Sequence, residues 1–208
     1  YECRHGIGYS RFTSSKNGVK ASVLSFVPLN DNCEISQLTL TNGSSEDKKL
    51  SVFSYVEWCL WNADDDMKNF QRNLSTGEVE VQDSTIYHKT EYRERRNHYA
   101  IYSVNTKIDG FDTSRDAFLG AYRGADSPEA VENGKCTNSI ASGWSPIASH
   151  QINVDLAAGE SKTFIFVLGY IENPEDEKWE SYGVINKTRA KEMLAKYQTD
   201  AQVEEAFA

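Results

Sequence analysis

Alternating apolar and polar residues, the pattern typical of half-buried β-strands, recur through residues 1–170. Apolar side chains dominate residues 19–27, and Asn17-Gly18 directly before them readily adopt the positive φ angles of a tight hairpin turn. Further strands are predicted at 35–40, 78–81, 85–88, 99–105, 150–156 and 163–171, the last two joined by a glycine-containing hairpin loop.

Residues 50–61 form the most aromatic of the predicted strands. Leu50 and Val52 would lie on one face and Phe53 and Tyr55 on the other, so both faces are apolar. A strand that is apolar on both faces is typical of the middle of a sheet. We therefore expect residues 50–61 to form a central strand.

The strand pattern stops between residues 108 and 146, where glycine, aspartate, serine and asparagine are frequent. Long loops with one helical turn at 128–132 are predicted there. After Asn173-Pro174 the period becomes helical, and Thr199 with Gln202 matches a capping box for a helix at 200–208. The helical stripe consists of Tyr182, Ile185, Ala190, Met193, Leu194 and Tyr197. The pattern predicts a mainly β fold, an antiparallel β-sandwich followed by helices.

Composition and charge argue against some classes of function. The 208 residues are 39% hydrophobic with a formal net charge of −9 at pH 7, which disfavours a general nucleic-acid binder. No apolar run reaches the length of a membrane span. The four cysteines (Cys3, Cys33, Cys59 and Cys136) lack metal-site spacing, so we expect reduced thiols in a cytoplasmic protein. The chain begins at Tyr1 without a methionine, and we expect it to be a fragment of a longer protein.

The segment 58–73 holds the densest candidate chemistry. Asn69 and Gln71 offer the amide donors and acceptors that sugar hydroxyls need, and Arg72 adds a fixed charge. The alternative is a capped turn after a long strand, with Trp58 and the second tryptophan of the segment in the core. Three aspartates at 64–66 lack the glycine and the alternating oxygens of a calcium loop, so a solvated acidic loop is favoured and no metal site is predicted.

The remaining motifs do not indicate a catalytic or binding site. Residues 92–99 mix basic, acidic and aromatic side chains, which favours a solvated edge or a domain contact over RNA binding. The four histidines are dispersed, and neither a hydrolase elbow nor a phosphate-binding glycine loop occurs. From the residues alone, the chain is a β-rich domain with one polar binding loop.

Longer runs of residues resemble a known family. Tyr-Glu-Cys-Arg-His-Gly-Ile-Gly-Tyr at 1–9, the segments 60–73 and 87–98, and the runs 128–134 and 139–148 are similar to the amino-terminal region of cellobiose phosphorylases. These enzymes are inverting disaccharide phosphorylases of glycoside hydrolase family 94. The resemblance covers essentially the whole chain, in order.

The resemblance implies a domain layout and a reaction. Residues 1–175 would be a galactose-mutarotase-like supersandwich lacking its first strands, and 176–208 the start of a helical linker toward an absent (α/α)6 barrel. The family cleaves cellobiose reversibly with inorganic phosphate as co-substrate and no cofactor, giving α-glucose 1-phosphate and glucose with inversion. The catalytic acid lies on the barrel, so the resemblance implies no catalytic residue in this chain.

The resemblance also implies site residues and partners. The loop holding Asn69, Gln71 and Arg72 would reach the active site of the other subunit of a homodimer, with Asn62 at the base of the loop. The acidic run at 64–66 departs from the expected pattern. Two alternatives stay open: a non-catalytic carbohydrate-binding or dimerisation domain, and a phosphorylase specific for cellodextrin or chitobiose.

Overall fold

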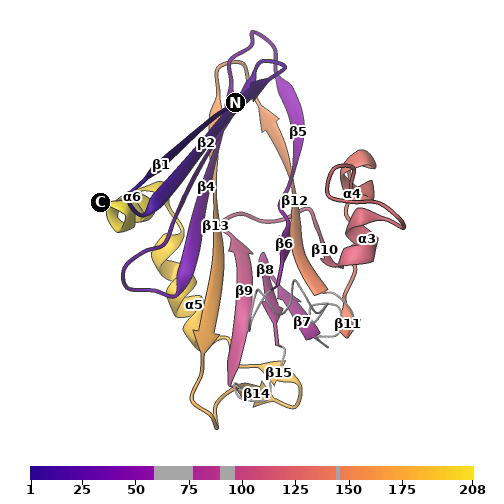
Figure 1. The fold of residues 1–208 in the computed structure, drawn as a ribbon, viewed down its shortest axis with the longest axis vertical. Helices are drawn as coiled ribbons and strands as arrows, with labels where there is room; N and C mark the ends of the chain where they lie inside the picture. Colours follow the sequence, from indigo (N-terminus) through magenta and orange to yellow (C-terminus); the bar gives the residue numbers. More distant parts are fainter. Residues whose placement is uncertain (59–76, 90–96, 144–145) are drawn as a thin grey trace.

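The computed structural model describes residues 1–58, 77–89, 97–143 and 146–208. Its main element is a nine-stranded sheet in which all neighbouring strands are antiparallel (Figure 1). In spatial order the strands are β1 (Glu2–Gly6), β2 (Tyr9–Lys16), β3 (Val19–Phe26), β4 (Cys33–Asn42), β13 (Ser161–Glu172), β9 (His98–Val104), β8 (Thr85–His88), β7 (Gly77–Gln82) and β11 (Ser142–Gly143).

A second antiparallel sheet packs against the first. It consists of β10 (Gly110–Ser114), β12 (Pro146–Leu156) and β5 (Lys48–Phe53), and β6 (Val56–Glu57) also pairs with β12. The facing sides share one core, with Ile86 and Phe164 from the first sheet and Ile152 and Val154 from the second. The predicted antiparallel β-sandwich is confirmed.

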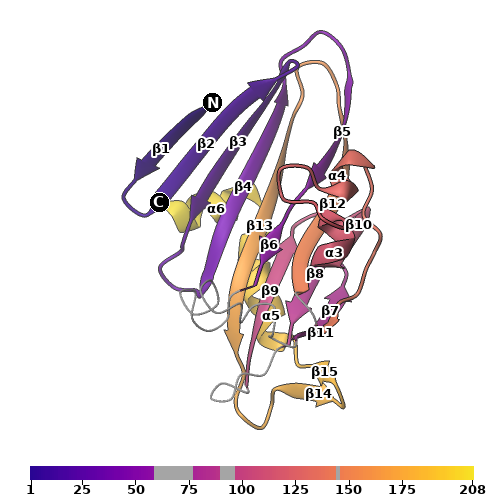
Figure 2. The same ribbon diagram turned by 45° about the vertical axis from the view of Figure 1, so that its right-hand side comes forward.

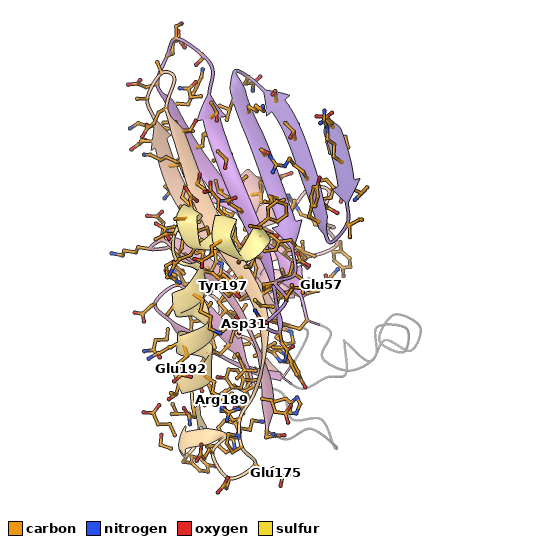
Figure 3. All side chains as sticks on the ribbon, turned by 90° about the vertical axis from the view of Figure 1, so that its left-hand side faces the viewer. Asp31, Glu57, Glu175, Arg189, Glu192 and Tyr197 are labelled. Carbon is orange, nitrogen blue, oxygen red and sulfur yellow. The ribbon has the colours of Figure 1, made fainter. Side chains whose placement is uncertain are left out.

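Helices cover the opposite face of the nine-stranded sheet. These are α5 (Thr188–Leu194), the 3-10 turn η1 (Ala195–Tyr197) and α6 (Asp200–Phe207), and Figure 3 shows them crossing that face. Buried Met193 and Leu194 share a core with Ile35 and Ile165 of the sheet. The Tyr197 hydroxyl donates to Asp31 Oδ2 at 2.6 Å, which ties η1 to the loop before β4.

A smaller helical layer lies on the outer side of the second sheet. Helices α3 (Arg115–Leu119) and α4 (Glu129–Glu132) bury Phe118 and Leu119 against Ile147 of β12, with Phe53 and Tyr55 packed beside them. The segment that carries α3 and α4 is therefore packed onto the sandwich. The predicted helical turn at 128–132 is confirmed as α4.

Several sequence-based expectations need correction. The pattern does not predict β1 and β2, nor β10 and α3. The expected central strand 50–61 is interrupted after β5, because the Ser54 hydroxyl takes the place of a main-chain acceptor for His150 N–H at 3.0 Å. Within the described residues β5 lies at an outer position of its sheet.

The C-terminal region also differs in part from expectation. Tyr182 and Ile185 lie in or beside a hairpin of β14 (Trp179–Ser181) and β15 (Val184–Ile185), and the helix begins only at Thr188. The capping box of Thr199 and Gln202 is confirmed at the start of α6. Strands β12 and β13 belong to opposite sheets, so the loop between them is no hairpin turn. The division into 1–175 and 176–208 stays a prediction.

Candidate functional site

The predicted binding residues Asn62, Asn69, Gln71 and Arg72 lie outside the described residues, as do Asp64–Asp66. The structure does describe the positions that flank them. Trp58, directly after β6, precedes this part of the chain, and Gly77 follows it as the first residue of β7. The candidate site is therefore built from the elements at these two positions.

Strand register places the flanking positions at one end of the sandwich. Gly77 pairs with Gly143, Val79 with His88, and Ile171 with Tyr99. The start of β7 and β9 and the end of β8, β11 and β13 consequently lie together (Figure 2). We call this region the loop end, defined by Trp58, Gly77, Lys89, Asn97, Gly143 and Pro146.

Trp58 anchors the first flank in the core. Its side chain is buried, and its ring lies against His88, with the ring centroids 5.3 Å apart. Burial lowers the pKa of His88 to about 3, so the imidazole is neutral at pH 7. The alternative prediction, that Trp58 lies in the core, is confirmed for this residue. Its ring packs against other core side chains at the loop end.

A carboxylate beside Trp58 joins β6 of the second sheet to helix α3. Glu57 Oε1 accepts from Arg115 Nε at 2.9 Å and from the Tyr55 hydroxyl at 2.6 Å. The hydrogen bond with Glu57 raises the pKa of Arg115. This contact holds the end of β6 against the start of α3.

Lys89 fixes the end of β8 to the β14–β15 hairpin. Its buried ammonium group donates to Gly183 O at 2.7 Å and lies 3.1 Å from Glu80 Oε1. Lys187 contacts the second oxygen of Glu80, and Ile185 N–H donates to Oε1 at 2.9 Å. We call Lys89, Glu80 and Lys187 the hairpin clasp.

The clasp sets the charge of Glu80. Burial by itself raises the pKa of this carboxyl, but the hydrogen bonds from Lys187, Ile185 N–H and Lys89 outweigh it. The net effect is a pKa below the ordinary value, so Glu80 is ionised at neutral pH. Two buried ammonium groups thus share one partly buried carboxylate at the loop end.

The start of β9 is fixed to the same stretch of chain. Asn97 Nδ2 donates to Asn173 O at 2.6 Å, and Asn173 N–H donates to Asn97 O at 3.1 Å. The Tyr99 hydroxyl donates to Asn186 O at 2.9 Å. Residues 173–187 therefore brace both Lys89 and Asn97. Sequence periodicity misses this brace because its partners lie far apart along the chain.

The described residues contain no group of three or more histidine, cysteine, aspartate or glutamate side chains arranged for a metal ion. Cys3, Cys33 and Cys136 are free thiols, and burial raises the pKa of Cys33 and of Cys136 to about 12. Cys59 lies outside the described residues. No described helix is long and apolar enough to cross a membrane.

Comparison with known proteins identifies the domain. A family model described as "Glycosyl hydrolase 94, supersandwich domain" matches residues 1–200. N,N'-diacetylchitobiose phosphorylase of Vibrio furnissii is 30% identical over 210 residues, covering 100% of this chain and 24% of that protein. Solabiose phosphorylase of Paenibacillus borealis is 27% identical, and the match covers 100% of this chain and 25% of that protein. The chain spans about a quarter of the length of these relatives.

A solved structure supports the fold. A provisional kojibiose phosphorylase from the human microbiome aligns with a TM-score of 0.53 and 10% identity, over 95% of this chain and 22% of the other. At that identity the alignment bears on architecture alone, and it agrees with the two packed sheets. The chain belongs to the supersandwich domain family of glycosyl hydrolase 94.

Proposed function

We propose that the whole protein is an inverting glycoside phosphorylase that converts cellobiose and inorganic phosphate to α-glucose 1-phosphate and glucose. The observation that carries this proposal is the glycosyl hydrolase 94 match over residues 1–200. Relatives named as chitobiose and solabiose phosphorylases match the chain over its full length. The choice of cellobiose rests on the resemblance of the segments 1–9, 60–73 and 87–98 to cellobiose phosphorylases.

The reaction needs one catalytic carboxyl group. A carboxylic acid protonates the departing glycosidic oxygen, and phosphate attacks the anomeric carbon from the opposite face of the ring. Phosphate is already an anion, so it needs no base to activate it. The acid belongs to the part of the protein beyond this chain, and no described carboxylate takes that role.

This chain contributes sugar contacts. Asn69, Gln71 and Arg72, with Asn62 beside them, bind the disaccharide in the active site of the other subunit of a homodimer. Neutral amides bond sugar hydroxyls without repelling phosphate, and a guanidinium group tolerates both. The loop end supports this role, because the residues that flank the segment, Trp58 and Gly77, are both buried in the sandwich. We place the protein in the cytoplasm.

A disaccharide panel tests the specificity. Phosphate consumption by the full-length protein is measured with cellobiose, N,N'-diacetylchitobiose, solabiose and cellotetraose at equal concentration. Cellobiose should give the highest kcat/KM. The 30% identity to the Vibrio enzymes favours the alternative of a chitobiose-specific phosphorylase. If N,N'-diacetylchitobiose gives a higher kcat/KM than cellobiose, chitobiose and not cellobiose is the substrate. No turnover with any sugar would favour the non-catalytic alternative.

Arg72→Ala tests the sugar contact. Losing one charge-assisted hydrogen bond should lower kcat/KM about ten- to a hundred-fold, with dimerisation unchanged. Mixing Arg72→Ala subunits with subunits that lack the catalytic acid should restore activity, because one site of each heterodimer then has an intact acid and an intact loop. Subunit exchange is first shown with differently tagged wild-type chains. Heterodimers without restored activity would mean that the loop acts within its own subunit or not at all, and an Arg72→Ala enzyme that matches the wild type would exclude the sugar contact.

A further inference from the structure

A cleft lined by polar and apolar side chains opens between the helical layer and the nine-stranded sheet. Its volume is about 470 Å³, and it lies between the β7–β8 turn, the end of β9 and the α5–η1 segment. These are the opposite ends of β7, β8 and β9 from the loop end. The volume falls within the roughly 300–1,000 Å³ typical of small-molecule sites.

Two buried hydroxyl groups form part of the floor. Thr85 and Ser103 face each other across the β8–β9 pair, and their oxygens are 2.7 Å apart. Each hydroxyl can donate one hydrogen bond and accept two, so their mutual bond leaves further capacity on both. The neighbouring outward face of the sheet is apolar where α5 covers it, which makes this polar floor a local exception.

Charged side chains line the walls. Lys107 and Lys191 are exposed, and neither forms a side-chain hydrogen bond or an ion pair with any described residue. Asp83 also lines the cleft, from the tight turn between β7 and β8, where its φ is 57°. Gln82, the residue before it, lines the cleft as well. The cleft therefore carries two free ammonium groups, one carboxylate and the exposed amides of Gln82 and Gln198.

We propose that this cleft binds a small phosphorylated sugar. The phosphate would bind Lys107 and Lys191, and the sugar hydroxyls would bond Asp83, Gln82 and the floor hydroxyls. Phosphate alone offers no sugar hydroxyl to Asp83 and the floor hydroxyls, and a neutral sugar offers no charge to the two lysines. The proposal goes beyond the phosphorylase reaction, since it needs no catalytic group.

Hydrogen–deuterium exchange of the full-length protein tests the site, because it reports where protection occurs. The probes are glucose 1-phosphate, glucose 6-phosphate, glucose and inorganic phosphate. A sugar phosphate should slow exchange in peptides covering 81–87, 103–108 and 189–198, while glucose and phosphate alone should not. Equal protection by phosphate alone would overturn the sugar part of the proposal, and equal protection by glucose would overturn the phosphate part.

A matched pair of variants tests the lysines. Lys107→Ala/Lys191→Ala should weaken sugar phosphate binding at these peptides at least about ten-fold. Lys20→Ala/Lys49→Ala removes two exposed lysines elsewhere and should leave binding unchanged. No protection in the wild type, or equal protection in both variants, would overturn the cleft site. Phosphorolysis is measured in parallel so that the two proposals can fail separately. Phosphorolysis without protection at the cleft peptides would contradict only the cleft site. Protection without phosphorolysis would contradict only the phosphorylase activity.

Discussion

Two histidines show how single residues make stability depend on pH. His88 and His150 are almost completely buried, and His150 stacks on Tyr102 with ring centroids 5.0 Å apart. Burial lowers the pKa of each imidazole to about 3. In the unfolded chain the pKa returns to about 6.5, so the unfolded state binds protons first as the pH falls. Their stabilising effect is complete above about pH 6.5 and is lost progressively toward pH 3.

We predict that the free energy of unfolding falls by about 2 kcal/mol per histidine between pH 7 and pH 5, since each loses 1.36 kcal/mol per pH unit below about 6.5. Urea unfolding at several pH values measures this. His150→Phe keeps an aromatic ring beside Tyr102 and should remove about half of the pH dependence. An unchanged pH dependence in this variant would show that His150 is not the titrating group.

At the scale of elements, the β14–β15 hairpin depends on the clasp. Glu80 joins Lys89 and Lys187, and the lysine side chains are only 7% exposed. Removing one partner from a buried ion pair leaves the other charge without compensation. Gly183 of the hairpin accepts from Lys89, and Asn173, shortly before the hairpin, bonds Asn97, so weakening the clasp should loosen the loop end as well.

Glu80→Gln should lower the free energy of unfolding by about 2–3 kcal/mol, somewhat less than for a fully buried pair, because 19% of the Glu80 side chain is exposed. Glu78→Gln is the matched control. Its carboxylate lies 3.4 Å from the same Lys89 Nζ but is 69% exposed, so we expect a loss below about 1 kcal/mol. Urea unfolding of both variants makes the comparison, and equal losses would contradict the clasp.

The elements also show what sequence periodicity can predict. Strands β3, β4, β9, β12 and β13 were predictable because buried faces require regular apolar positions. Strands β1 and β2 were missed because most of their side chains are exposed, which leaves the alternation weak. Periodicity also cannot assign strands to sheets, and so it joined β12 and β13 as a hairpin.

At the scale of the whole molecule, the candidate site divides into two parts. The sugar-binding residues Asn69, Gln71 and Arg72 were proposed from side-chain chemistry and resemblance, and they stay a prediction. The loop end that flanks their segment was not predictable, because the clasp pairs Glu80 with Lys187, 107 positions apart. Such pairs follow from the packing of the hairpin on β7 and β8, and no local pattern encodes that packing.

The central claim is that the whole protein transfers a glucosyl group to phosphate with inversion. The most direct measurement is NMR of the full-length protein incubated with cellobiose and inorganic phosphate. We predict that α-glucose 1-phosphate and glucose form in equal amounts and that no reaction occurs without phosphate. Release of two glucose molecules without phosphate, formation of the β-phosphate, or failure to form any sugar phosphate from cellobiose would contradict the claim.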